Sequence, residues 1–129
     1  MNFGILGEAK IAREHVVPAI LNAGHKVTHV GRRIPGQVGL PEIYGNAIET
    51  DYETLINEPS VDAIYNPLPN HLHVPYSIEA LKAGKHVLCE KPVALNLDEL
   101  SQLENAAKDS KAFFYEAFMV RSHPQWHWL

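Results

Sequence analysis

Cysteine, positive charge and long apolar runs are all scarce in this sequence of 129 residues. The single cysteine, Cys89, has no partner for an internal disulfide, which fits a reducing cytosol and predicts a cytoplasmic protein. No apolar run approaches the ~18 residues of a membrane-spanning helix, and the segment from Met1 to Leu6 does not resemble a secretory signal, so no membrane partner is expected. The net charge of -4 lacks the basic excess of a nucleic-acid-binding protein, so no nucleic-acid partner is expected either.

Short apolar runs alternate along the chain with segments of helical periodicity. This alternation implies right-handed crossovers and predicts a doubly wound α/β fold with a mostly parallel sheet of about six strands. Asp51, Asn70 and Asn96 stand where helix N-caps are expected, and Leu97, Leu100 and Leu103 should share one helix face. The predicted strands are residues 2–6, 26–30, 46–49, 61–65, 86–89 and 112–117, and the predicted helices are 11–23, 51–57, 71–83 and 98–108.

The segment at residues 7–12 follows the first predicted strand and opens the first predicted helix. Read as G-x-[GA]-x-x-[GA], it places Gly7, Ala9 and Ala12 where a tight turn, a close backbone approach to a pyrophosphate and helix packing require small residues. The pattern predicts a Rossmann-type dinucleotide-binding turn, and the alternative is a plain strand-to-helix turn of another doubly wound fold. Its expected cofactor-binding residues are Gly7, Glu8, Ala9, Lys10 and Ile11.

Glu8 is unusual in such a turn, because a carboxylate repels the phosphates of a dinucleotide. Lys10 and Arg13 lie close enough in sequence to offset its charge. We therefore expect the Glu8 side chain to point toward solvent.

The end of the second predicted strand indicates which dinucleotide is bound. NAD-specific domains carry an acid there that bonds the ribose 2′-hydroxyl, whereas this strand ends in Arg32 and Arg33. Two guanidinium groups can bind a 2′-phosphate through charge-assisted hydrogen bonds, which predicts NADP as cofactor, with NAD as the alternative. The alternative is that both arginines are solvated loop residues.

The fifth predicted strand ends in Glu90-Lys91-Pro92, which places a charged pair at the ligand-binding edge of a parallel sheet. Pro92 restricts Lys91 to an extended conformation and favours a cis peptide bond more than other residues do. The simpler alternative for Lys91 is a surface lysine beside a turn. Cys89, on the strand itself, is expected to be a buried and inert thiol.

Together with residues 61–73, VDAIYNPLPNHLH, this strand end resembles the Gfo/Idh/MocA oxidoreductase family, most closely its sugar- and dihydrodiol-oxidising branch. The resemblance runs from Gly4 to Pro124 and implies an N-terminal Rossmann domain at residues 1–121, with residues 122–129 beginning the connection to a second α+β domain. That second domain, absent from this chain, supplies most of the substrate pocket in the family and usually the oligomer interface.

The resemblance also implies roles for individual residues. Glu90 would bond the nicotinamide ribose, Lys91 would reach that ribose and the substrate hydroxyl, and Arg121 would face the nicotinamide or substrate pocket. Lys91 would be catalytic, polarising the hydroxyl or relaying its proton if burial makes it a suitable acid and base near neutral pH. The nicotinamide-side ribose and phosphates would be lined by Pro67, Leu68, Asn70 and His73.

The expected function is therefore the cofactor-binding domain of an NAD(P)(H)-dependent enzyme that transfers hydride to or from a sugar, polyol or dihydrodiol hydroxyl, inactive on its own. The alternative is a non-catalytic nucleotide-binding or interaction module. His123 and His127 have a helical metal-ligand spacing but lack a third ligand, so no metal is expected. Trp126, Trp128 and Leu129 are expected to be exposed and to favour association, which leaves a homo-oligomer open.

Overall fold

A computed structural model describes residues 1–127, and in this part of the chain one sheet has six strands in the order β3-β2-β1-β4-β5-β6. Every neighbouring pair is parallel, which confirms the predicted sheet. Because β1 pairs with both β2 and β4, the strand order reverses beside it. The strands are β1 Asn2–Leu6, β2 Lys26–Gly31, β3 Ile48–Thr50, β4 Ala63–Asn66, β5 His86–Cys89 and β6 Phe114–Glu116.

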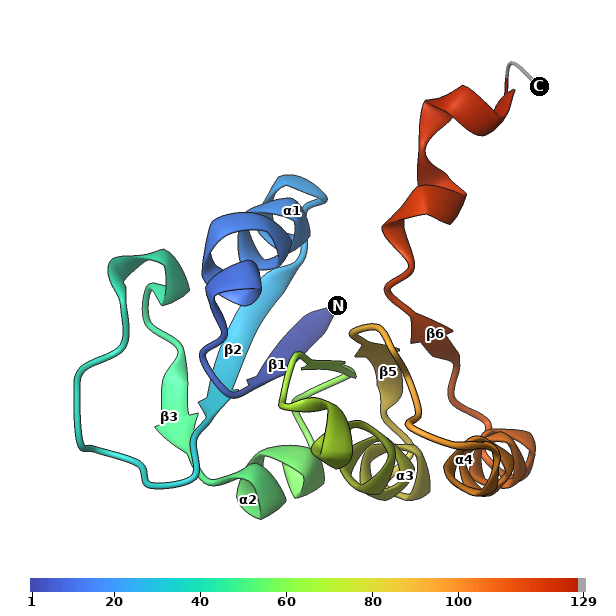
Figure 1. Ribbon diagram of the computed structural model, residues 1–129. Helices are drawn as coiled ribbons and strands as arrows, with labels where there is room; N and C mark the ends of the chain where they lie inside the picture. The colour runs from blue at the N-terminus through green and yellow to red at the C-terminus, as the bar shows by residue number, and fades with distance from the viewer. Residues whose placement is uncertain (128–129) are drawn as a thin grey trace.

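Helices cover both faces of this sheet. Helix α1 lies on one face, while α2, α3 and α4 lie side by side along the other (Figure 1). The arrangement confirms the doubly wound architecture. The helices are α1 Val17–Asn22, α2 Tyr52–Asn57, α3 His73–Lys82 and α4 Leu97–Asp109, with a π-helix at Ala12–Val16 and 3₁₀ turns at Glu42–Tyr44, Asn70–Leu72, Met119–Ser122 and Pro124–His127.

The core has two layers because successive strand residues point to opposite faces of the sheet. Ile5 and Tyr65 pack with Val17 on the α1 side, whereas Leu6 and Ile64 pack on the side covered by α2 to α4. All five side chains are fully buried. Both central strands are therefore buried on both faces, as parallel strands require.

Proline explains why the first helix is not regular. Residues 10–22 are helical without a break, but Ala12–Val16 form a π-helix in which the Val17 N–H donates to the Ala12 carbonyl. Pro18, which follows directly, has no N–H to donate and its ring crowds the preceding turn. The widened turn accommodates it, a feature that the apolar pattern alone did not indicate.

Two of the three expected N-caps are confirmed. Asp51 accepts from the Thr54 N–H at 2.8 Å, and Asn96 accepts from the Glu99 N–H at 2.9 Å. Asn70 as an N-cap is wrong, because it lies within a 3₁₀ turn and makes no side-chain capping bond. The chain after β4 turns too tightly for the α-helix to begin before His73.

The predicted face of α4 is only partly correct. Leu103 is buried at 2% exposure, but Leu97 is 81% exposed, so Leu97 does not share the core-facing side. Leu97 is the first residue of the helix. The outer end of α4 therefore leaves apolar surface uncovered.

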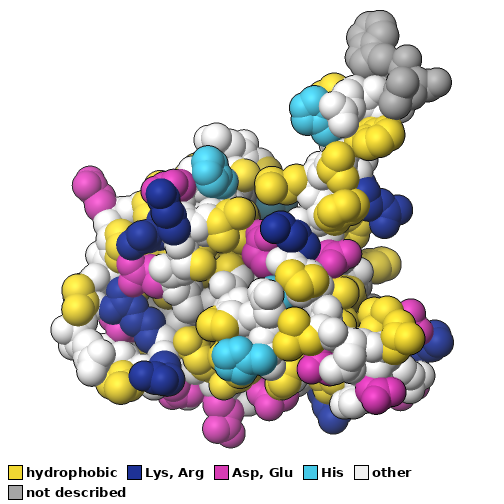
Figure 2. Space-filling model, viewed as in Figure 1, with side chains coloured by type: hydrophobic (Ala, Val, Ile, Leu, Met, Phe, Trp, Pro, Cys, Tyr) yellow, Lys and Arg dark blue, Asp and Glu magenta, His cyan; other side chains and the backbone are white. Residues whose placement is uncertain are grey.

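The chain after β6 runs away from the sheet (Figure 1), and hydrophobic side chains gather along this projection (Figure 2). Met119 is 66% and Trp126 is 51% exposed, so the expected exposure of Trp126 is confirmed, while Trp128 and Leu129 lie outside the described residues. Residues Pro124–His127 form a short 3₁₀ turn on this projection. Within residues 1–127, no helix has the length and apolar character needed to cross a membrane.

Candidate functional site

Four loops carry the candidate site, and each follows the carboxyl end of a strand. They are the turn after β1, the start of the loop after β2, the Asn66 to Asn70 turn after β4, and the segment from Glu90 after β5. Parallel strands bring these ends to one edge of the sheet, and ligands of doubly wound folds bind where the strand order reverses. In this chain that point lies between β1 and β4.

Gly7 holds the first turn in place. Its φ of +77° is one that side chains with a Cβ rarely adopt, and a Cβ there would lie 3.0 Å from Leu68 Cδ2. Its N–H donates to the Gly31 carbonyl at the end of β2 over 2.8 Å. Gly7 therefore joins the turn to β2 and lets the loop after β4 approach it closely.

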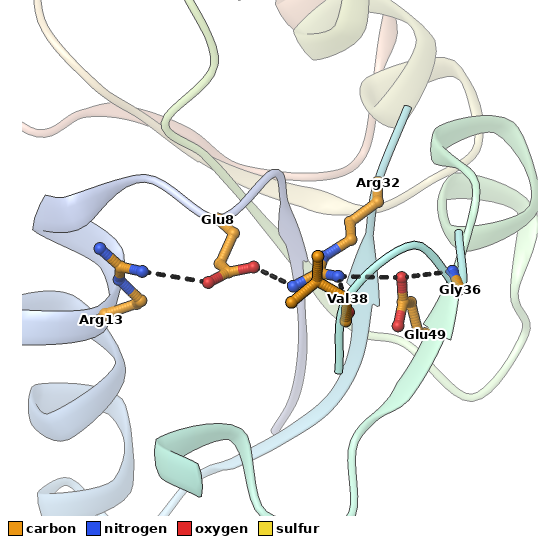
Figure 3. Close-up of polar contacts among 6 residues, drawn as sticks. All are labelled: Glu8, Arg13, Arg32, Gly36, Val38 and Glu49. Atoms are coloured by element: carbon orange, nitrogen blue, oxygen red, sulfur yellow. Dashed lines mark hydrogen bonds and ion pairs between the residues drawn. The ribbon is translucent and has the colours of Figure 1, made fainter. Parts of the chain in front are cut away.

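Four charged side chains meet beside this turn, and we name Glu8, Arg13, Arg32 and Glu49 the charged cluster. Glu8 lies between two arginines, with Arg13 Nη1 3.1 Å from its Oε1 and Arg32 Nη2 donating to its Oε2 (Figure 3). Arg32 Nη1 is 3.2 Å from Glu49 Oε1. The expectation that Glu8 points to solvent is therefore wrong, because the two guanidinium groups attract it inward.

The charged cluster also anchors the loop that follows β2. Arg32 Nη1 donates to the Val38 carbonyl, and the Gly36 N–H donates to Glu49 Oε1 at 2.8 Å (Figure 3). Lys10, which was expected to offset Glu8, instead lies 3.9 Å from Glu14 and is largely exposed. Arg13 alone fulfils the sequence prediction of a compensating cation on this helix.

Arg33 differs from Arg32, since its side chain is exposed and takes part in no ion pair among the described residues. Both arginines border a cavity of about 380 Å³. The cavity thus offers one free and one paired guanidinium group to an anion. Its lining residues are Glu8, Arg32, Arg33, Ile34, Gln37 and Val38.

Tyr44 lies near the charged cluster but forms no part of it. Its hydroxyl is buried and is the unpartnered buried side-chain polar atom among the described residues. Burial, and next the negative charge of Glu8, raise the pKa of Tyr44 to about 12. The hydroxyl therefore keeps its proton at neutral pH.

A second group of polar residues lies under the loops that follow β4 and β5. We name Tyr65, Asn66, His73 and Glu90 the buried cluster, because none of them is more than 9% exposed. The Tyr65 hydroxyl donates to Glu90 Oε1 at 2.7 Å, and burial followed by this hydrogen bond raises the pKa of Tyr65. Glu90 is thereby held with one carboxylate oxygen fixed.

His73 joins the two loops directly. Its Nδ1 lies 2.8 Å from the Pro92 carbonyl and its Nε2 lies 2.6 Å from the Leu68 carbonyl. Because a carbonyl only accepts, the ring nitrogen that carries the proton donates it to the carbonyl that it faces. The ring is 1% exposed and has no nitrogen left for a ligand, so His73 supports the loops rather than lining the site as expected.

Asn66 completes the buried cluster. Its side-chain amide donates to the His73 carbonyl at 3.1 Å and to Ser77 Oγ at 3.2 Å, and its side-chain oxygen accepts from the Leu68 N–H at 3.3 Å. These bonds fix the turn after β4 to the start of α3. Asn66, which the sequence pattern did not indicate as a site residue, thus fixes the backbone of this turn.

Lys91 and Cys89 flank Glu90 in opposite surroundings. Lys91 is exposed, so the burial that a proton-relay role requires is not supplied by the described residues. The Lys91–Pro92 peptide bond is cis, as the sequence allowed. Cys89 is fully buried, and burial raises the pKa of its thiol to about 12, so the expected buried thiol is confirmed.

Comparison with known proteins agrees with this geometry. Residues 1–118 match the Gfo/Idh/MocA family, described as an oxidoreductase family with an NAD-binding Rossmann fold. The chain belongs to this family. The strand order described above is thus that of an NAD-binding Rossmann fold.

Two curated relatives are close over almost the whole chain. An uncharacterized oxidoreductase, ORF334, of Rhizobium meliloti is 42% identical over 98% of this chain and 39% of its own length. D-xylose 1-dehydrogenase (NADP(+)) 2 of Haloferax volcanii is 37% identical over 96% of this chain and 39% of its own length. The chain therefore spans about two fifths of the length of these relatives.

A solved structure has the same fold. The 3-ketoreductase KijD10 of Actinomadura kijaniata, in complex with NADP and TDP-benzene, superposes with a TM-score of 0.90 at 31% identity. The match covers 99% of this chain and 40% of that one. The Gfo/Idh/MocA fold predicted from residues 61–73 and 90–92 is therefore confirmed.

Arg121 is not brought to these loops. It lies in the exposed 3₁₀ turn Met119–Ser122 on the projecting segment, and no hydrogen bond or ion pair of its side chain is formed with the described residues. Among residues 1–127, no group of three or more His, Cys, Asp or Glu side chains is arranged to hold a metal.

Sequence reasoning did not single out Glu49, Tyr65 or Glu116 as site residues. Glu116 Oε1 accepts from the Val93 N–H at 3.0 Å and so supports the segment after Pro92. Tyr65 lies one residue before the end of β4 and Glu49 lies in the middle of β3, and no motif or spacing in the sequence marks either as a site residue.

Proposed function

We propose that this chain is the cofactor-binding part of an NADP(H)-dependent oxidoreductase that acts on a sugar, polyol or dihydrodiol hydroxyl. The observation that carries the proposal is the meeting of the Gly7 turn, the Arg32–Arg33 loop and the Glu90–Lys91 strand end at one sheet edge, in a chain of this family. The D-xylose relative and KijD10, which are both associated with NADP, support the phosphorylated dinucleotide.

The residues present fit a dinucleotide. The turn after β1 has Gly7 at positive φ and small side chains at Ala9 and Ala12, which leaves backbone N–H groups accessible to a pyrophosphate. Gly7, Glu8, Ala9, Lys10 and Ile11 would border the pyrophosphate. Arg32 and Arg33 would bind the 2′-phosphate at the nearby cavity.

At the other end of the site, Pro67, Leu68 and Asn70 would line the nicotinamide-side ribose, and Glu90 would accept from its hydroxyl through the oxygen that Tyr65 leaves free. His73 would act by holding Leu68 and Pro92 in place. The bound nicotinamide supplies the hydride chemistry. Lys91 would orient the substrate hydroxyl and take its proton. The Lys91 ammonium group must first lose a proton of its own, and burial by a further part of the protein would make that loss less costly.

We further propose that residues 1–121 form the Rossmann domain and that 122–129 begin the connection to a substrate domain. Arg121 would then reach the substrate pocket only when that domain is present. The homo-oligomer and the cytoplasmic location stay predictions. The projecting apolar side chains Met119 and Trp126 favour association, which size measurements on this chain would detect.

A non-catalytic nucleotide-binding module is the second candidate, and the exposure of Lys91 favours it for this chain alone. Both candidates require dinucleotide binding and differ only in turnover. Fluorescence titration with NADPH and NADH tests the first requirement, and failure of both to bind at millimolar concentration would refute the cofactor-domain proposal. An assay of the isolated chain with an aldose panel tests turnover, and we expect none.

A further inference from the structure

Arg32, which the proposed function assigns to the 2′-phosphate, is already paired with carboxylates of the same chain. Glu8 and Glu49 both contact its guanidinium group, and its side chain is only 13% exposed. An anion entering the cavity therefore meets an arginine whose charge is compensated. Binding of the phosphate to Arg32 requires that one of these contacts be given up.

The two ends of the guanidinium group are held differently (Figure 3). Nη1 donates to Glu49 and to the Val38 carbonyl, and Glu49 also accepts from the Gly36 N–H at 2.8 Å, so this end is built into the loop after β2. Nη2 donates to Glu8, and within the described residues it has no other hydrogen-bond partner. Nη2 is therefore the end that can change partner without disturbing the loop.

Glu8 can leave Arg32 and still be paired. Its other carboxylate oxygen lies 3.1 Å from Arg13 Nη1, on the helix that follows the turn. Glu8 and Arg32 both line the cavity together with the exposed Arg33. A phosphate that takes the place of Glu8 on Nη2 would also gain Arg33, which has no ion pair among the described residues.

We propose that Glu8 is a specificity-determining residue that competes with the 2′-phosphate of NADP(H) for Arg32. The phosphate binds by exchange: it displaces Glu8 from Arg32 Nη2, and Glu8 keeps its contact with Arg13. NAD(H) carries a neutral 2′-hydroxyl, which has no charge with which to displace a carboxylate, so the Glu8–Arg32 pair stays intact. Glu8 thereby lowers the preference for NADP(H) that Arg32 and Arg33 create. This inference rests on the proposed function.

The decisive variant is Glu8→Gln, which keeps the size of the side chain and removes its charge. Both dinucleotides carry a pyrophosphate that Glu8 repels, so both should bind more tightly, but only NADPH should also gain the released Arg32. We expect the dissociation constant to fall about fivefold for NADPH and about twofold for NADH in fluorescence titrations, the range that one partly exposed ion pair can supply. Calorimetry with 2′-AMP and 5′-AMP measures binding at the adenosine end alone. Only the dissociation constant of 2′-AMP should show the larger, fivefold fall.

Glu14→Gln is the matched control. It removes a negative charge from the same helical segment, but Glu14 pairs with Lys10 and does not contact Arg32. The ratio of NADPH to NADH affinity should therefore stay that of the parent chain. In an Arg32→Gln background, Glu8→Gln should no longer change this ratio. Circular dichroism and urea unfolding establish that each variant is folded.

An unchanged NADPH to NADH ratio in folded Glu8→Gln, or an equal change in Glu14→Gln, would overturn the competition. An equal gain in the NADPH to NADH ratio when Glu8→Gln is made in the Arg32→Gln background would overturn it as well. The failure of the proposed function looks different: neither dinucleotide then binds to the parent chain or to any variant. Binding of both dinucleotides with an unaltered ratio overturns only the role of Glu8.

Discussion

The charged cluster and the buried cluster lie at the same edge of one sheet but are held by opposite kinds of interaction. In the charged cluster, ion pairs join side chains that keep 13 to 40% of their exposure. In the buried cluster, hydrogen bonds join side chains that are at most 9% exposed. Side chains of the charged cluster can therefore exchange a partner for a solvated anion. In the buried cluster, no water is at hand to replace a hydrogen bond that is lost.

This difference has an energetic consequence. An exposed ion pair contributes about 0.2–1 kcal/mol, because water and salt solvate both partners when it breaks. A buried polar group that loses its partner costs about 1–3 kcal/mol, because nothing replaces the bond. Substitutions in the buried cluster should therefore lower the free energy of unfolding, while those in the charged cluster should chiefly change ligand selectivity.

The largest expected effect concerns access to Cys89, which lies next to Glu90. Burial raises the pKa of its thiol to about 12, so little thiolate exists at pH 8, and the sulfur is fully buried. We expect iodoacetamide to alkylate it at least about a thousandfold more slowly in the native chain than in urea, as for a group exposed only by unfolding. Mass spectrometry measures the rates, and similar rates would mean that the buried cluster opens readily.

The same thiol gives a pH dependence whose sign is defined. Its ordinary pKa is 9.0 and the folded value is about 12, so the unfolded chain loses this proton first as the pH rises. The stability that the neutral thiol contributes is complete below pH 9 and is lost between pH 9 and 12. Cys89→Ala should remove this part of the alkaline loss in urea unfolding experiments.

Asn66→Ala should have the next largest effect. It removes two donated bonds and one accepted bond from a fully buried site and leaves the His73 carbonyl with one donor fewer. The free energy of unfolding should fall by about 3 kcal/mol, as when a buried hydrogen-bond network is broken. Urea denaturation measures the change. Asn70→Ala, at an exposed asparagine in the same turn, is the control and should change stability by less than about 0.5 kcal/mol.

Gly7→Ala should cost about 2 kcal/mol, because the new Cβ would adopt a strained φ and approach Leu68 Cδ2 to 3.0 Å. Gly24→Ala is the matched control, with a φ of +79° and no atom within 4 Å of the new Cβ. The free energy of unfolding of the control should fall only by the cost of the strained φ, about 1 kcal/mol. Equal losses in urea unfolding would mean that the contact between the turn and the β4 loop contributes nothing.

Arg32→Gln should have the smallest effect on stability, at most about 1 kcal/mol, because the ion pairs it removes are partly solvated. Its unfolding midpoint should also respond to 0.5 M NaCl less than that of the parent chain. A loss as large as that of Asn66→Ala would show that the charged cluster is part of the rigid frame.

Much of the site could be predicted because it depends on local patterns. Gly7 was recognised from its place between a strand and a helix, and Glu90-Lys91-Pro92 from a strand that ends in charge. The side-chain partners could not be predicted in the same way. Glu8 was expected to face water, since nothing near it in sequence indicated that Arg32, across the sheet edge, would draw it inward. Asn70 and His73 were assigned from their turn, but burial decided that His73 supports the loops.

The sequence by itself determined the alternation of strands and helices, the parallel sheet, the buried cysteine and the edge where the candidate site lies. These follow from periodicity, turn residues and the rule that parallel strands end together. Only the tertiary structure decided which charges meet. Glu8, Arg32 and Glu49 come from three different elements, and their pairing depends on distances that no spacing along the chain specifies. For the same reason, only the fold separates a cluster that can exchange partners from one that cannot.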